Sequence, residues 1–191
     1  NMKKIVSLIA IAFSLVVYGQ CDTTLISNAG WSVVSTSSEE PGDPGSNAID
    51  GDINTIWHTE WDANQPEFPH EIIINLGASY PVDGIGYTPR SVTTLNGKMA
   101  GYEIYLSTDG ITWGGPDKIG TVTYVDNNDL ATKKLIFGAV TAQYVKLVGT
   151  SSYADEYYMV ASEIDVYQDL ICGATGKENQ TINFTTIGEQ L

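Results

Sequence analysis

Short runs of alternating or β-branched apolar residues, separated by turn sequences, constrain the fold of this chain more than any other feature. The runs are WSVVSTSS, HEIIINLG, VDGIGYTPR, YEIYLSTDG, TKKLIFG, AQYVKLVGTSS and EIDVYQ. After the first twenty residues no segment keeps a helical period for more than a turn or two. Many short strands with regular turns are typical of an antiparallel β-sandwich, so the predicted fold class is all-β.

Two local features refine this prediction. Asp109 and Gly110 lie between strand-like runs in STDGITW, and this dipeptide predicts a β-hairpin. Ser46 is a suitable N-cap for a single helical turn over the following Asn-Ala-Ile, which is as much helix as we expect.

The first twenty residues have the composition of a secretory leader. Lys3 and Lys4 precede the apolar run IVSLIAIAFSLVV, which is too short to span a bilayer comfortably. We therefore expect residues 1–20 to be a signal peptide, with Asn1 a cloning remnant, and the mature protein to be secreted or held at the bacterial cell surface. The residues before Cys21 do not match the small residues of a lipoprotein signal, so a lipid anchor is the less favoured alternative.

The remaining chain is expected to hold one domain, over residues 21–172. Residues 173–191 change in composition and are predicted to be a linker and the first strand of a further, truncated module. The two cysteines, Cys21 and Cys172, flank the domain. In an oxidising compartment this placement predicts a disulfide between them, with two unpaired thiols as the alternative.

The charge of the chain limits its partners. Lys and Arg total 9 against 23 Asp and Glu, a formal net charge of -14. Such a surface repels nucleic acid and anionic lipid, so we expect neither nucleic-acid binding nor membrane insertion, and we expect a monomer. Acidity also fits cation binding, although solubility alone explains most surface carboxylates.

The segment AIDGDINT contains the oxygen donors that a calcium ion needs. Asp50 and Asp52 lie on either side of Gly51, whose backbone bends freely, and Thr55 adds a hydroxyl. The alternative is an ordinary exposed acidic turn. Next along the chain, Trp57 is expected to face the core, which would direct His58 to the rim.

A sugar site requires fixed polar groups and an exposed ring. Arg90 is the one arginine of the chain, it follows a proline, and its planar guanidinium can span two hydroxyls. Asn96 offers an amide at a glycine turn, and His58 an imidazole. Considered singly, Arg90 could be an ion-pair partner and His58 a half-buried structural residue; His70 is expected to be a strand-edge residue.

Five segments, AIDGDINTIWHT, YTPR, NGKMAGYEIYLSTDGITW, AQYVKLVG and ASEIDVY, follow one another in an order that resembles the coagulation factor 5/8 type C, or discoidin-like, domain. The nearest subgroup is the family 32 carbohydrate-binding modules of bacterial secreted proteins. The resemblance covers roughly residues 29–167. It implies a jelly-roll β-sandwich of about eight strands, with a structural calcium ion and a sugar site on loops at one end.

The resemblance also implies roles for individual residues. For calcium it adds the Glu163 carboxylate and the carbonyls of Ala48 and Ala161, with Asp52 acting through its carbonyl. Galactose-binding members imply polar contacts from His58, Arg90 and Asn96, and a stacking ring from Tyr157. The resemblance leaves open further contributions, from Tyr153, Tyr158, Trp61 and either Glu39 or Glu40.

The predicted function is therefore a non-catalytic carbohydrate-binding module in a larger secreted protein, with a glycan or polysaccharide as partner. No pair of carboxylates has a reason to flank a cleft, and no nucleophile and base fall together, so we do not predict an enzyme. Two alternatives are an adhesion module that binds protein or a cell surface, and an appendage of a glycoside hydrolase. The sequence leaves the sugar open among galactose, N-acetylgalactosamine, glucosamine and uronic acid types.

Overall fold

The computed structural model of the chain describes residues 23–90, 96–154 and 156–169. The predicted leader, the predicted linker from residue 173, and both Cys21 and Cys172 lie outside the described residues. Within that described part, no helix is both long enough and apolar enough to traverse a lipid bilayer.

The described residues form strands and one short 3-10 helix, which confirms the all-β prediction. The elements are β1 (Thr23–Leu25), β2 (Ser32–Thr36), η1 (Gly45–Ile49), β3 (Trp57–His58), β4 (His70–Thr88), β5 (Met99–Ser107), β6 (Lys118–Thr121), β7 (Lys133–Ser152), β8 (Val160–Ala161) and β9 (Glu163–Asp169).

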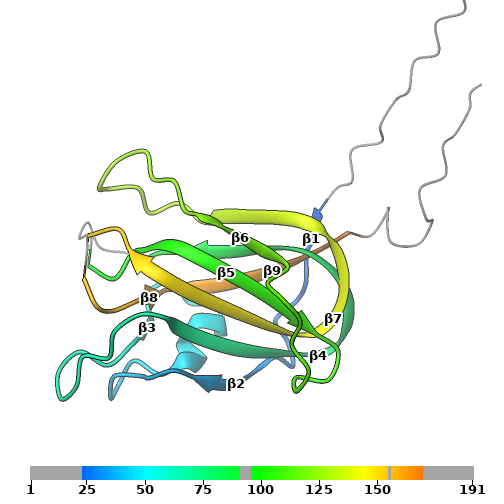
Figure 1. The fold of residues 1–191 in the computed structure, drawn as a ribbon, viewed down its shortest axis with the longest axis horizontal. Helices are drawn as coiled ribbons and strands as arrows, with labels where there is room; N and C mark the ends of the chain where they lie inside the picture. Colours follow the sequence, from blue (N-terminus) through cyan, green and yellow to red (C-terminus); the bar gives the residue numbers. More distant parts are fainter. Residues whose placement is uncertain (1–22, 91–95, 155, 170–191) are drawn as a thin grey trace, which may run out of the picture.

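One curled antiparallel sheet makes most of the molecule. Its strands follow the order β1-β9-β4-β7-β5-β6, with β2 also paired to β4, and a separate small sheet pairs β3 with β8. The long strands β4 and β7 pair over two stretches with irregularities between Asn75 and Tyr80 and between Val82 and Gly84. At these irregularities the strands bend, so that β7 starts beside β6, curls round one side of the molecule and returns through its middle (Figure 1).

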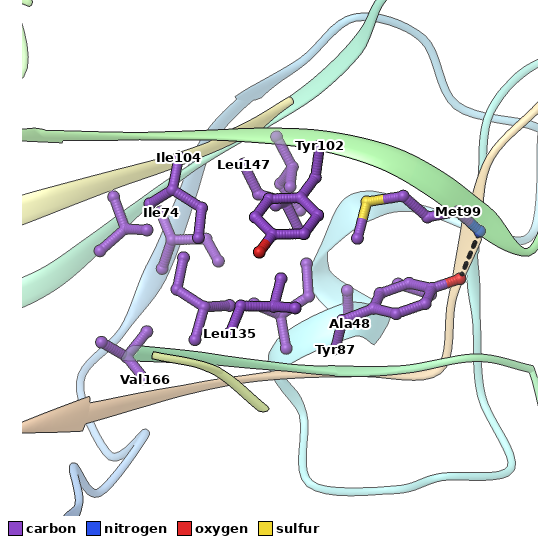
Figure 2. Packing of buried hydrophobic residues seen from close by; sticks show 14 of the residues in the cluster. Ala48, Ile74, Tyr87, Met99, Tyr102, Ile104, Leu135, Leu147 and Val166 are labelled. Atoms are coloured by element: carbon purple, nitrogen blue, oxygen red, sulfur yellow. Dashed lines mark hydrogen bonds between the residues drawn. The ribbon is translucent and has the colours of Figure 1, made fainter. Parts of the chain in front are cut away.

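The buried face of the sheet follows the alternation of the sequence. On β4 the residues Ile72, Ile74 and Leu76 are buried, whereas the residues between them are half-buried. Figure 2 shows Leu147 and Tyr102 above Leu135 in this core, with the Tyr87 hydroxyl accepting the 3.1 Å hydrogen bond of the Met99 amide. Each fully buried aliphatic side chain of this kind contributes about 1.5–3 kcal/mol.

Two local predictions need correction. A short helix forms where the turn was predicted, but Pro44 is its N-cap and Ser46 lies within it, with no side-chain capping bond. The Asp109-Gly110 turn does lie between paired strands, β5 and β6, yet the residues directly after it are not a strand. The Asp109 carboxylate instead accepts the amides of Ile111 and Thr112, which closes a longer loop before β6 begins.

Candidate functional site

The acidic turn after η1 lies against the last strand, as the calcium prediction requires. The Gly51 amide is 3.2 Å from both carboxylate oxygens of Glu163, which follows it by 112 residues. Gly51 has a φ of 82°, a conformation that residues with a Cβ rarely adopt. The turn therefore delivers Asp50 and Asp52 to the start of β9, next to a buried glutamate.

The other predicted oxygen donors surround this contact. The Asp50 carboxylate accepts the Thr55 hydroxyl at 2.8 Å, and the same hydroxyl is 2.8 Å from the Asp52 carbonyl. The Asp52 carboxylate accepts the backbone amide and side-chain amide of Asn54, so it is occupied within the loop. Of the two oxygen-bearing groups of Asp52, it is therefore the backbone carbonyl that faces the Thr55 hydroxyl.

Electrostatics make this cluster suited to a cation. Burial raises the pKa of Glu163 to about 7; the Gly51 amide opposes the shift, and the charges of Asp50, Asp165 and Asp52 add to it. Among the described residues no three acids, histidines or cysteines stand close enough to hold a metal by side chains alone. A set of two carboxylates, a hydroxyl and carbonyls fits the hard-oxygen preference of calcium.

The two predicted carbonyl donors lie on the elements that frame the turn. Ala48 on η1 and Ala161 on β8 are both fully buried, and Ala161 pairs with Trp57 of β3. Trp57 is also fully buried, which confirms its predicted place in the core. The small sheet thus joins the acidic turn to the chain just before β9.

His58 occupies the same short strand but is more enclosed than strand alternation predicted. Its side chain is 4% exposed, because the rings of Tyr158 and Trp61 lie against it with centroids 5.4 Å and 6.2 Å away. The prediction that His58 points to an open rim is therefore wrong in this respect. Its Nδ1 lies 2.6 Å from the Thr59 carbonyl, and since a carbonyl only accepts, Nδ1 carries the proton.

The charge state of this imidazole follows from its surroundings. Burial lowers the pKa of His58; the bond to Thr59 opposes this, and the Arg90 guanidinium lowers the pKa further. Asp43 and Glu40 act in the opposite direction. The ring is accordingly neutral near pH 7, with Nε2 as an acceptor.

Arg90 follows the end of β4 and lies beside the same loops. It lines a cleft of about 430 Å³ with Asp43, Asn47 and Thr55, among others. Its Nε is buried and has no hydrogen-bond partner among the described residues. Buried donors without a partner are rare in folded proteins, and they concentrate where a ligand completes the bonding.

Asn96 lies at this end of the molecule as well. The carbonyl of the next residue, Gly97, accepts the Val160 amide at 2.9 Å, and Val160 is the register partner of His58. In the described part of the chain, Asn96 Oδ1 is another buried polar atom with no partner. The Gly97 amide donates to the Glu156 carboxylate at 2.9 Å. Burial raises the pKa of the Tyr158 phenol, and the nearby charge of Glu156 raises it further.

Glu40 and Trp61 are two further residues beside His58. The Glu40 carboxylate accepts the Trp61 amide at 3.0 Å, and the Glu40 amide donates to the His58 carbonyl at 2.8 Å. The neighbouring Glu39 instead accepts the Gly45 amide within its own loop. Of the two glutamates that the sequence left open, Glu40 is therefore the one beside His58.

The aromatic residues divide differently from the sequence expectation. Tyr157 is 54% exposed, and in the described structure its ring makes no ring contact; its carbonyl accepts a 2.6 Å bond from His70 Nε2. Tyr158 and Trp61 are the rings that contact His58. His70 is the first residue of β4, as expected, and it is buried. Its bond to Tyr157 anchors the loop that carries Tyr157 and Tyr158, called the tyrosine loop below.

Sequence reasoning gave no role to Asp43 or Glu156, and it left Trp61 undecided. Asp43 accepts the His58 amide through its carbonyl, and Glu156 links Asn96's neighbour to Tyr158. Asp43 acts through its backbone carbonyl and Glu156 through its carboxylate, and both lie in loops, which carry no periodic signal. The only available hint was the position of Trp61 three residues after His58 in one loop.

Comparison with known proteins identifies the family of this domain. The F5/8 type C domain matches residues 32–164. Among curated proteins, a sialidase of Micromonospora viridifaciens is 37% identical over 146 residues, covering 74% of this chain and 22% of the sialidase. A galactose oxidase of Gibberella zeae is 34% identical over 144 residues, covering 75% of this chain and 20% of the oxidase. The chain thus spans about a fifth of each of these relatives.

Solved structures give the same result. The family 32 carbohydrate-binding module of Clostridium perfringens NanJ, in complex with galactose, is 30% identical with a TM-score of 0.64, over 77% of this chain and 100% of that one. Another Clostridium perfringens module of the same type, in complex with GalNAc-β-1,3-galactose, is 31% identical with a TM-score of 0.66, over 75% of this chain and 99% of that one. Because the family model matches residues 32–164 and these structures agree with the fold over about three quarters of the chain, the chain belongs to the F5/8 type C domain family and has the structure of a family 32 carbohydrate-binding module.

Proposed function

We propose that this domain binds a galactose-type sugar at the loop cluster formed by Glu40, His58, Trp61, Arg90, Asn96 and Tyr158, and that it performs no catalysis. One observation carries the proposal: buried polar atoms of Arg90 and Asn96 have no partner among the described residues, and both lie at the same end as His58. The relatives in complex with galactose and with GalNAc-β-1,3-galactose support the choice of sugar.

The polar groups of the cluster complement the hydroxyls of a sugar. His58 Nε2 accepts a hydroxyl proton, because Nδ1 is already committed to Thr59. The Arg90 guanidinium donates to two neighbouring hydroxyl oxygens in one plane, and Asn96 both donates and accepts. A neutral hexose supplies both donors and acceptors, whereas an apolar ligand would leave all three groups unsatisfied.

Trp61 and Tyr158 supply the apolar part of the site. Trp61 is 46% exposed while one part of its ring rests on His58, so an open indole surface is already held in place. The C–H face of a galactose ring stacks on such a surface. Tyr157, the ring expected from the sequence, stays a candidate for a contact further out because it is exposed on the same loop.

A calcium ion held by Asp50, Thr55 and Glu163, with the carbonyls of Ala48, Asp52 and Ala161, is part of the same proposal. The ion would supply positive charge to a buried carboxylate and fix the acidic turn to β9. Thr55 and Arg90 line one cleft, so the ordering of the turn bears directly on the sugar site. Its role is structural.

The parent protein is proposed to carry this module beside a catalytic domain, since the curated relatives are a sialidase and a galactose oxidase several times longer. A weak site fits such a tether, because linkage raises the effective concentration of the substrate. Export of the protein to the cell surface or medium is part of the proposal.

Calorimetric titration of the domain with galactose tests the proposal. We expect a dissociation constant between about 1 μM and 1 mM, equivalent to roughly -8 to -4 kcal/mol, and loss of measurable binding in Arg90→Ala. Lys146→Ala is the matched control, because Lys146 lies over the rings of Tyr105 and Trp113 on the sheet. Unchanged galactose binding in Arg90→Ala would refute the assignment of the site.

A further inference from the structure

A groove with an unusual charge separates β6 from the start of β7. It measures about 400 Å³ and is lined by Tyr102, Lys118, Thr121, Val122, Thr123, Thr132, Lys133, Lys134, Leu135 and Ile136. Three of these residues are lysines and none is acidic, although the chain has 23 acids against 9 bases. The groove is therefore a local reversal of the charge of the molecule.

The two walls of the groove are strand edges. In the described structure β6 pairs on one side only, with β5, and the first residues of β7 pair with β4, where Lys134 faces Gly86. Figure 1 shows the start of β7 running beside β6 before it curls away. Hydroxyls of Thr121, Thr123 and Thr132 add donors and acceptors along these walls.

A phenol forms part of the floor. The Tyr102 residue is 4% exposed, and its hydroxyl makes no hydrogen bond to the described residues. The register pairs Tyr102 with Gly120 of β6, where an added Cβ would meet that hydroxyl at 2.6 Å. In Figure 2 the hydroxyl lies near Leu135, another residue of the groove, and no dashed line reaches it. The hydroxyl opens into the groove as a donor that no protein group uses, so it is available to an acceptor group of a ligand.

The lysines differ in how far they are already neutralised. Lys133 forms an ion pair with Asp129 and lies 5.0 Å from the Tyr124 ring centre. Lys134 lies 4.7 Å from the Tyr167 ring centre, and its charge lowers the pKa of Asp165 against the effect of burial. The Lys118 ammonium forms no ion pair or hydrogen bond within the described part of the chain. Lys118 and Lys134 thus remain the cations available to an anion in the groove.

From these observations we infer that the groove is a second glycan site, which binds an acidic sugar through Lys118, Lys134 and the Tyr102 hydroxyl. The ammonium groups take the carboxylate or sulfate of the sugar, and the phenol and threonines take its hydroxyls. A volume of about 400 Å³ is within the range of small-ligand pockets, roughly 300–1,000 Å³. The groove and the cleft beside Arg90 have no lining residue in common, so they are two distinct sites.

The position of the groove allows one glycan to extend from site to site. The Thr132 hydroxyl is 2.8 Å from that of Thr88, which precedes Arg90 by two residues. The end of the groove at Thr132 therefore lies close to the loop cluster. A chain that carries both neutral and acidic sugars would gain from contacts at both places.

Calorimetric titration with two acidic ligands and one neutral ligand tests this inference. The acidic ligands are a trigalacturonate, which carries carboxylates, and a sulfated galactose disaccharide; galactose is the neutral ligand. We expect at least one acidic ligand to bind the full chain, with affinity that falls as salt rises, and the double variant Lys118→Gln, Lys134→Gln to weaken it by about five- to tenfold. Tyr102→Phe should weaken it about two- to fivefold while the fold is retained.

The controls separate this site from the loop cluster. Lys146→Gln removes one positive charge outside the groove and should leave acidic-sugar affinity unchanged, whereas Lys118→Gln and Lys134→Gln, made singly, should each weaken it. Arg90→Ala should abolish galactose binding and leave acidic-sugar binding intact, so failure of the proposed galactose site and failure of the groove give different results. The inference is overturned if neither acidic ligand binds, if the double lysine variant binds both as the native chain does, or if Arg90→Ala abolishes acidic-sugar binding.

Discussion

At the scale of single residues, the loop cluster depends on hydrogen bonds that fix the direction of each polar group. The Thr59 carbonyl determines which nitrogen of His58 carries a proton, and the rings of Trp61 and Tyr158 hold the imidazole in position. Burial and the nearby Arg90 lower its pKa, so the neutral form is maintained near neutral pH. The neighbours of His58 thus fix both its orientation and its neutral form.

This arrangement predicts an acid limit for sugar binding. A pKa lowered in the folded state means that the neutral ring stabilises the domain fully above pH 6.5, and that this contribution is lost as the pH falls through the lowered value. Protonation also removes the acceptor at Nε2. We therefore expect galactose affinity to be constant from pH 8 to 6.5 and to fall below that, by about tenfold per unit once His58 is protonated.

Proton NMR can assign this effect, since the chain has only two histidines. The loss of affinity should follow titration of the His58 ring, and not that of His70, whose pKa burial also lowers. Affinity that stays level down to pH 5 while the His58 ring titrates would contradict the assigned role.

At the scale of elements, the tyrosine loop after β7 is held at several points. Ser152 bonds both the amide and the carbonyl of Glu156, at 2.7 Å and 2.9 Å, and His70 holds the Tyr157 carbonyl. Gly97 meets this loop closely: its φ is 69°, and a Cβ there would overlap the side chain of Val160. These contacts place Tyr158 against His58 before any sugar arrives.

The close approach of Gly97 to Val160 predicts that adding one methyl group at Gly97 lowers the stability of the domain. Gly97→Ala should destabilise the domain by about 1–3 kcal/mol, since it adds both backbone strain and overlap. Gly114→Ala is the matched control, because space around Gly114 is open and its φ is not positive. Urea unfolding of both variants measures the difference; equal midpoints would show that the β8 contact does not require glycine.

The elements also show how far the sequence could be interpreted. The alternating runs correctly located the main strands, but HEIIINLG and VDGIGYTPR belong to one long strand, β4, that bends at a bulge. A turn sequence inside a continuous strand cannot be told from a true turn without its partner strand. The strands β3 and β8 have two residues each, too few to give any period.

The same limit applies to the site. Asp50 and Thr55 could be proposed from the acidic turn itself, whereas Glu163 came only from the resemblance to the F5/8 type C family. In the structure Thr55 bonds Asp50, and the Gly51 amide between the two aspartates contacts Glu163. The choice between Tyr157 and Tyr158 was not predictable, because neighbouring residues in a loop have no fixed alternation. The lysine groove was missed since Lys118 and Lys134 lie on different strands and meet only through the curl of β7.

At the scale of the whole molecule, the acidic turn and β9 join an early loop to the end of the domain. Glu163 is 8% exposed, and in the described structure its nearest charges are acidic. Without a cation, the negative charges of the acidic turn and of Glu163 repel one another and oppose the contact between the turn and β9. A bound calcium ion would convert that repulsion into attraction across more than a hundred residues of chain.

Calcium removal should therefore lower the melting temperature. We expect calcium at a hundred times its dissociation constant to add about 2.7 kcal/mol to the free energy of unfolding, which EDTA removes. Glu163→Gln should abolish this response, whereas Glu71→Gln, a change on β4 away from the turn, should keep it. Equal melting curves with calcium and with EDTA would contradict the proposed ion, and so would stabilisation by magnesium of the same size.

The pairing of β1 with β9 has a mechanical consequence. Thr23 faces Asp169, so the described chain enters and leaves at one edge, whereas β3, β8 and the tyrosine loop lie toward the opposite side (Figure 1). Tension between the two ends loads the bonds of this strand pair one after another, as in a zipper, and peels β1 away first. The loops of the proposed sugar site lie outside that line of force, so we expect them to keep their arrangement while the outermost strand separates.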